Sequence, residues 1–153
     1  MSTTSITFAV VVPGEPRGYG RTRIAMAGGK PRPVTSKEDR LYRVQIKAAW
    51  MKSGCPRLRS GPWSAVVCAY MSRPKAHFNT KGELNAAGLR SEFPSRKPDV
   101  DNILKNIDAL VALGAVPDDA HLISAHVVKE WADEGGPRVV FRVMTELGSR
   151  GDA

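Results

Sequence analysis

KPDVDNILKNIDALVALGAVPDDA, residues 97–120, decides most of the fold expected for this chain of 153 residues. After Asp99 the apolar side chains recur at helical spacing, and Gly114 is typical of the residue that follows the end of a helix. The segment therefore predicts a helix over 99–114, whose buried stripe consists of Ile103, Ile107, Leu110 and Val111.

Four further segments are rich in β-branched and apolar residues, as strands are. Two of them, residues 122–131 and 138–146, flank the turn sequence DEGG at 133–136, which predicts a β-hairpin. The other two are residues 5–12 and 64–72. We therefore expect four strands.

A second helix is predicted over 37–53. Ser36 is followed three positions later by the acidic Asp39, a pattern typical of a helix start, and Gly54 marks its end. The apolar residues of this helix that share one face are expected to pack on the core, and they are Leu41, Val44, Ala48 and Met51.

Residues 13–35 and 73–98 are rich in glycine, proline and basic side chains, which favours irregular loops. A loop as long as 73–98 in a small domain is usually functional or partly disordered. The element order β-α-β-α-β-β predicts one domain over 1–153, a small mixed α/β domain of the α+β class.

The longest apolar stretch, residues 8–12, is too short to cross a membrane, and we find no signal peptide. The protein is expected to be intracellular, with no membrane partner. Cys55 and Cys68 match neither a zinc pair nor a redox motif, so ordinary thiols in a reducing cytoplasm are expected.

The charge is unevenly distributed. The formal net charge is +8, yet residues 99–153 carry 5 Lys/Arg against 10 Asp/Glu. Carboxylates repel phosphate unless a cation bridges them, so this pattern suggests a polyanion-binding protein with a focused acidic site. A solvated basic surface with an acidic tail is the alternative.

The acidic residues have a spacing that suggests a site. At 100° per residue, Lys105 lies about 40° from Asp101, on the face opposite the apolar stripe. Asp99 stands at the helix entrance, and Asp118 and Asp119 follow the turn after Gly114. We therefore expect three carboxylates to converge.

Two or three aspartates with no cysteine or paired histidine nearby favour Mg²⁺ or Mn²⁺. Such an ion activates water and stabilises charge on a phosphodiester. Each residue also has an ordinary structural use: Asp99 as a cap, Asp101 with Lys105 as a surface ion pair, and Asp118 with Asp119 as turn residues.

The motif KPDVDN at 97–102, with Lys105 and DDA at 118–120, resembles the RusA family of Holliday-junction resolvases, especially its phage-borne members. The resemblance implies a small homodimeric α/β protein of the bacterial or phage-infected cytoplasm that cuts four-way DNA junctions with Mg²⁺ or Mn²⁺. It assigns catalysis to Asp99, Asp101, Lys105 and Asp119. Metal binding falls to the three aspartates.

Residues 18–42 are similar to the opening of the phage branch, but basic loops are common. The other features indicate no second site. His121 and His126 are five apart, so on a strand they point to opposite faces, which argues against a histidine-metal nuclease. No phosphate-cradling glycine motif is present. The tryptophans are expected in the core or in a dimer contact rather than stacked on unpaired DNA bases. They are Trp50, Trp63 and Trp131.

The main hypothesis is a metal-dependent endodeoxyribonuclease that binds and cleaves Holliday junctions or other branched DNA in recombination and repair. The alternative is a non-catalytic basic DNA-binding protein. A nucleotide-sugar transferase with an Asp-x-Asp site is disfavoured, because the chain is short and basic.

Overall fold

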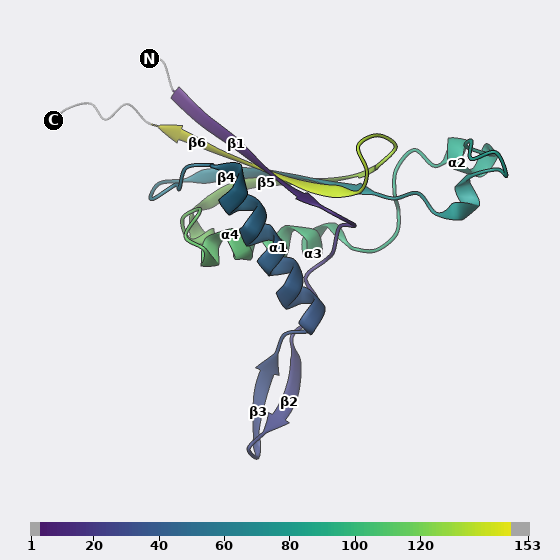
Figure 1. The fold of residues 1–153 in the computed structure, drawn as a ribbon. Coiled ribbons are helices and arrows are strands. Elements are labelled where there is room, and N and C mark those ends of the chain that lie inside the picture. The colour runs from purple at the N-terminus through teal and green to yellow at the C-terminus, as the bar shows by residue number, and fades with distance from the viewer. Residues whose placement is uncertain (1–3, 148–153) are drawn as a thin grey trace.

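The computed structural model describes residues 4–147. Its centre is a four-stranded sheet in the order β1-β6-β4-β5 (Figure 1), in which β4 and β5 run parallel and the other neighbours antiparallel. The strands are β1 (Thr4–Pro13), β4 (Trp63–Met71), β5 (Leu122–Trp131) and β6 (Arg138–Leu147). Strands and helices are mixed in one chain, which confirms the α+β class.

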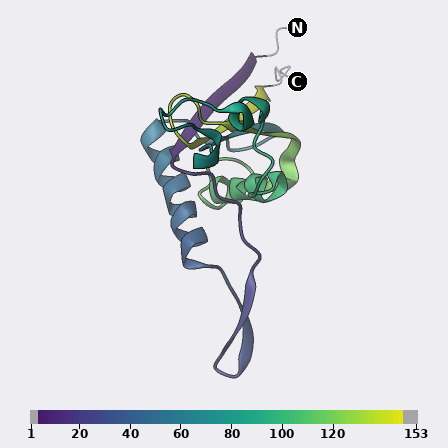
Figure 2. The same cartoon turned by 90° about the vertical axis from the view of Figure 1, so that its right-hand side faces the viewer.

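One face of the sheet carries the core. Phe8, Val10 and Val12 of β1 are buried while the alternate residues Ala9 and Val11 are exposed, as the period of a strand requires. The helices lie against the buried face (Figures 1 and 2). They are α1 (Lys37–Ser53), α3 (Val100–Leu104) and α4 (Asp108–Ala112).

The predicted hairpin of the last two strands is wrong, because β4 lies between β5 and β6. The connection after β5 passes the end of β4, where the Ala132 N–H donates to the Met71 carbonyl at 2.8 Å. The side chain of Asp133 is held there by Arg73, at 2.6 Å from Nε. These contacts at the end of β4 hold the connection between β5 and β6 across that strand.

Helix α1 has the predicted bounds, but the predicted buried face is wrong. The Ser36 side chain accepts from the Asp39 N–H at 3.1 Å, and Gly54 ends the helix with φ of 69°. The core side chains are Tyr42, Ile46 and Trp50. At 100° per residue these three side chains lie on the side of the helix opposite the predicted stripe. This side faces the core because burying the two large rings of Tyr42 and Trp50 removes more apolar area from water than burying the predicted stripe. The predicted residues are exposed: Leu41, Val44, Ala48 and Met51.

The helix predicted over 99–114 is present but interrupted. A 3₁₀ turn, η2 (Lys105–Ile107), separates α3 from α4. Ile103, Ile107 and Leu110 are buried as predicted, Val111 is half-buried, and Gly114 follows the last turn with φ of 73°.

Residues 13–35 are not wholly irregular, because they contain a hairpin of β2 (Arg23–Ala27) and β3 (Lys30–Val34). Gly28 and Gly29 join the strands with φ of 60° and 74°, the positive values that a tight hairpin turn needs. The two prolines of β3 hid this strand in the sequence. On a two-stranded ribbon their missing N–H groups face outward, where no partner is required.

Residues 73–98 contain two short helices, η1 (Lys75–His77) and α2 (Ala86–Arg90). Arg73 fixes this excursion, because its Nη1 donates to the carbonyls of Gly88 at 2.9 Å and Ser91 at 3.2 Å. The Trp131 Nε1–H also donates to Ser91 O, at 2.9 Å. The long segment is therefore bound to the end of the sheet.

Trp50 and Trp63 are buried in the core as predicted, and Trp131 is half-buried. Both cysteines are free thiols, and Cys68 is buried. His121 is not on a strand, because it ends the turn that precedes β5. Within residues 4–147 no helix is long and apolar enough to span a membrane.

Candidate active site

The motif residues 97–102 lie where the chain leaves the 73–98 excursion and enters α3. The Asp99 backbone caps this helix, since its carbonyl accepts from the Ile103 N–H at 3.0 Å. Its side chain makes no capping hydrogen bond, contrary to the capping role weighed from the sequence. The exposed Asp99 carboxylate therefore does not hydrogen-bond to the N–H groups at the start of the helix.

Lys105 lies one turn beyond Asp101, as the angular estimate predicts. Its ammonium is 3.4 Å from Asp101 Oδ2 and 3.1 Å from Asn102 Oδ1. The side chains are open to solvent, with 53% of Lys105 and 67% of Asp101 exposed. An ion pair so exposed adds little stability, and it leaves both groups accessible to a ligand.

Asp118 and Asp119 lie at the turn η3 (Asp119–His121), which the core holds in place. The indole of buried Trp63 donates to the Asp118 carbonyl at 3.3 Å. Asp118 Oδ1 accepts from the Ala120 N–H at 2.9 Å. The Asp118 carboxylate therefore shapes the turn, as one reading of the sequence had it.

The two neighbouring carboxylates differ in proton affinity. The Ala120 N–H, followed by a hydrogen bond with Asp119, lowers the pKa of Asp118. The pKa of Asp119 is raised, chiefly by that shared hydrogen bond and by the negative charge of Asp118, and the charge of Asp108 adds to the effect. Asp119 is thus the carboxylate that gains most from a nearby cation.

The expected convergence of three carboxylates is not seen. Among residues 4–147 no three side chains of aspartate, glutamate, histidine or cysteine lie close enough to hold a metal ion. Asp119 lies within the electrostatic reach of Asp108, at the start of α4, whereas Asp101 belongs to α3. The expectation rested on the turn after Gly114 bringing Asp118 and Asp119 back to the helix entrance, whereas the Trp63 indole holds the backbone of Asp118.

A positioning residue that we did not predict holds the entrance to the motif. The Lys129 ammonium, from β5, lies 2.6 Å from the Arg96 carbonyl and 3.2 Å from that of Pro98. It fixes the backbone just before Asp99. A single lysine in a predicted strand carries no signal of this role.

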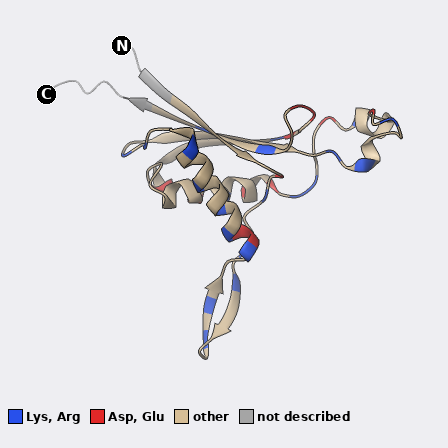
Figure 3. Cartoon of the chain, in the orientation of Figure 1, with Lys and Arg blue, Asp and Glu red and all other residues tan. Residues whose placement is uncertain are grey.

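The chain before the β2–β3 hairpin packs directly on α3. The Tyr19 N–H donates to Asn102 O at 2.8 Å, and the buried Asn106 Nδ2 donates to Arg17 O at 2.6 Å. A Cβ on Gly18 would stand 2.9 Å from the Cβ atoms of both Asn102 and Pro98, so only glycine fits. Figure 3, which colours Lys and Arg blue, shows basic residues along the hairpin and in the 73–98 excursion.

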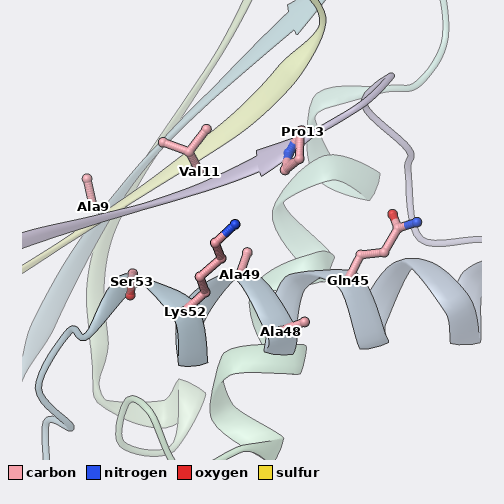
Figure 4. A pocket seen from close by; sticks show the side chains of 8 residues that line it. All are labelled: Ala9, Val11, Pro13, Gln45, Ala48, Ala49, Lys52 and Ser53. Atoms are coloured by element: carbon pink, nitrogen blue, oxygen red, sulfur yellow. The ribbon is translucent and has the colours of Figure 1, made fainter.

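An open groove of about 650 Å³ runs between β1 and α1 (Figure 4). Its lining includes none of the aspartates of the motif and is largely apolar, so the groove is separate from the candidate active site. The lining residues are Ala9, Val11, Pro13, Gln45, Ala48, Ala49, Lys52 and Ser53.

Comparison with known proteins identifies a family for this chain. The family model described as endodeoxyribonuclease RusA matches residues 13–144, which is most of the chain. The chain belongs to the RusA endodeoxyribonuclease family. RusA membership implies an endonuclease that acts on DNA junctions. The chain is also 29% identical, over 130 residues, to the uncharacterized protein YqaN of Bacillus subtilis strain 168. That match covers 84% of this chain and 91% of YqaN.

Proposed function

We propose that this RusA-family chain is a metal-dependent endodeoxyribonuclease that cleaves Holliday junctions or other branched DNA as a homodimer. The observation that carries the proposal is the pair of exposed aspartates at the mouth of α3, with the Lys105 ammonium 3.4 Å from one of them. Such a group of charges fits the hydrolysis of a phosphodiester.

The donor set fits Mg²⁺ or Mn²⁺. Mg²⁺ keeps several waters and is usually held by one or two carboxylates together with substrate phosphates, so three protein ligands need not meet before DNA binds. We assign Asp99 and Asp101 as the primary ligands and, on the family resemblance, Asp119 as the third. A bound ion supplies an activated water and neutralises charge on the phosphate.

The protein's own residues have separate roles in this proposal. Lys129 and the backbone hydrogen bond between Tyr19 and Asn102 fix the α3 entrance, so the two aspartates are held in place before substrate binds. The Lys105 ammonium offsets the negative charge that grows on the phosphate in the transition state. The basic side chains around the site hold the phosphates of the arms of the junction.

The proposed homodimer contact is the exposed apolar face of α1. The exposed stripe of α1 includes Leu41, Val44 and Met51, which are 53%, 60% and 62% exposed respectively. It runs beside the groove of Figure 4, where Val11 is 51% exposed. Two sites related by two-fold symmetry match the paired strands of a junction, so we assign this face to a second copy.

The test is incubation of a labelled four-way junction with the protein, with Mg²⁺ and with EDTA. We expect nicks that EDTA abolishes. Asp101→Asn is expected to end cleavage while keeping junction binding, because it removes a ligand oxygen and a charge with little change in volume. Glu92→Gln, a loss of the same charge on the 73–98 excursion, is the matched control.

Undiminished cleavage in EDTA would reject the metal mechanism. Binding without cleavage under either metal would instead support the non-catalytic DNA-binding alternative. Equal loss of binding and cleavage in Asp101→Asn would make that residue structural.

A further inference from the structure

The β2–β3 hairpin stands away from the body of the protein as an arm (Figures 1 and 2). Every residue of both strands is exposed, including Ile24 at 77% and Met26 at 70%. A two-stranded hairpin alone is at best marginally stable in water. An arm that leaves large apolar side chains in solvent is therefore suited to a partner.

The register gives the arm two chemically different faces. Ile24 pairs with Pro33 and Met26 pairs with Pro31. Residues directly opposite each other share a face, so these four side chains form one apolar face. The alternate pairs place the basic side chains on the other face, and they are Arg23, Arg32 and Lys30.

The base of the arm is fixed beside the candidate active site. Arg17, whose carbonyl accepts from Asn106 of η2, also lies 3.7 Å from the buried Asp39 of α1. The Arg43 guanidinium stacks over the Tyr19 ring at 5.5 Å. The arm therefore leaves the body next to the helix that carries Asp99 and Asp101, and its direction is set by both helices.

The reach and charge of the arm fit branched DNA. Five residues of strand at about 3.4 Å each extend roughly 17 Å, more than the width of a DNA groove at roughly 12 Å. Residues 16–37 carry six Lys/Arg and no acidic residue. Phosphates attract such a segment.

The apolar face needs a partner without hydrogen-bonding groups. In a continuous duplex the flat faces of base pairs are hidden by stacking, whereas a branch point interrupts the stack. Apolar side chains inserted at unstacked base steps are an established means of holding distorted DNA. We propose that the arm reads the branch point, with Ile24 and Met26 packed on its unstacked base pair and the basic face on the adjoining phosphates.

This inference rests on the proposed function but is tested without cleavage. The probe is a four-way junction with 2-aminopurine at the branch, whose fluorescence rises on unstacking, titrated in EDTA beside a linear duplex of the same sequence. The variants are Ile24→Ser/Met26→Ser for the apolar face and Arg23→Gln/Arg32→Gln for the basic face. Leu89→Ser, a 70% exposed side chain on α2, is the matched control.

The wild-type protein and Leu89→Ser are expected to raise the fluorescence. Ile24→Ser/Met26→Ser should abolish the rise and weaken junction binding on the order of tenfold, with duplex binding unchanged. Arg23→Gln/Arg32→Gln should weaken junction and duplex binding alike.

Two outcomes would overturn the inference. One is an unchanged fluorescence rise and junction preference in Ile24→Ser/Met26→Ser. The other is a shift of that variant from dimer to monomer in sedimentation, with equal loss on both DNAs, which would assign the arm to a second copy. A wild-type protein that unstacks the branch but never nicks it with metal would refute the proposed catalysis and leave the arm's role standing.

Discussion

Lys105 is held at the mouth of α3 by Asp101 and Asn102, and its role is open to a direct test. We expect Lys105→Ala to slow single-turnover cleavage by about a hundredfold or more at saturating protein, because its charge acts mainly on the transition state. Junction affinity should change far less. The measurement is a single-turnover time course beside a binding titration.

Lys47→Ala, on α1, is the control for the loss of one lysine. If Lys105 were only a helix-surface partner of Asp101, its removal would cost at most about 0.5 kcal/mol of stability and leave the cleavage rate intact.

Tyr42 presents a different residue-scale question, because its hydroxyl is buried and makes no hydrogen bond within the usual limits among residues 4–147. Burial raises the pKa of Tyr42 to about 12, partly opposed by the nearby backbone of Arg17. A raised folded-state pKa means that the stabilising effect is complete below the ordinary value near 10 and is lost as pH rises through about 12.

We therefore expect Tyr42→Phe to leave the free energy of unfolding at pH 7 unchanged or higher by about 1 kcal/mol, since no hydrogen bond is lost. Between pH 10 and about 12 the wild-type protein should lose roughly 2 to 3 kcal/mol that the variant keeps. Urea melts at pH 7 and across that range measure both. An identical alkaline loss in the variant would contradict the assignment.

At the scale of elements, α1 has two apolar faces, and only one faces the core. If the exposed face carries the dimer contact, Val44→Glu should yield a monomer that folds normally, because it places a charge where a second copy packs. Sedimentation measures the state, and the ratio of paired to single nicks in a junction measures the consequence. Leu89→Glu, at a 70% exposed position on α2, should remain dimeric. A Val44→Glu dimer would exclude this surface.

The same helix marks the limit of sequence-based prediction. Its ends follow from local chemistry, Ser36 as cap and Gly54 as stop, and the sequence placed both correctly. The face that the helix turns towards the core does not follow from local chemistry, because residues 41–51 carry apolar side chains on both sides of the helix. Only the presence of β1 and α4 decides that Tyr42 and Trp50 face inward.

Long-range pairing was likewise beyond the sequence. The turn at 133–136 has hairpin composition, yet Asp133 is drawn to Arg73, about sixty residues earlier, and β4 separates the two strands. At the site, the proximity of Lys105 to Asp101 was predicted correctly, because it depends only on helical spacing. The position of Asp119 depends on long-range contacts, such as that of the Trp63 indole with the Asp118 carbonyl, which periodicity does not reveal.

For the whole molecule, the net charge of +8 predicts binding that weakens steeply with salt. Each phosphate contact releases counterions and contributes about −0.9 to the slope of log affinity against log salt. Titrations between about 50 and 200 mM salt should show a slope of several units, reduced by about two in Arg23→Gln/Arg32→Gln. A slope near zero for the wild-type protein would rule out phosphate binding as the main interaction.

The position of β6 has a consequence for how the protein is made. This strand comes last among the elements, yet it lies between β1 and β4 and pairs with both. A ribosome adds roughly 5 to 20 residues per second, so β1 waits several seconds for the strand with which its backbone pairs. The sheet cannot be completed until residues 138–147 have left the exit tunnel, although β4 and β5 pair without them. Folding is therefore expected late in synthesis and slow, and a nascent chain stopped before Arg138 would lack the strand that joins β1 to β4.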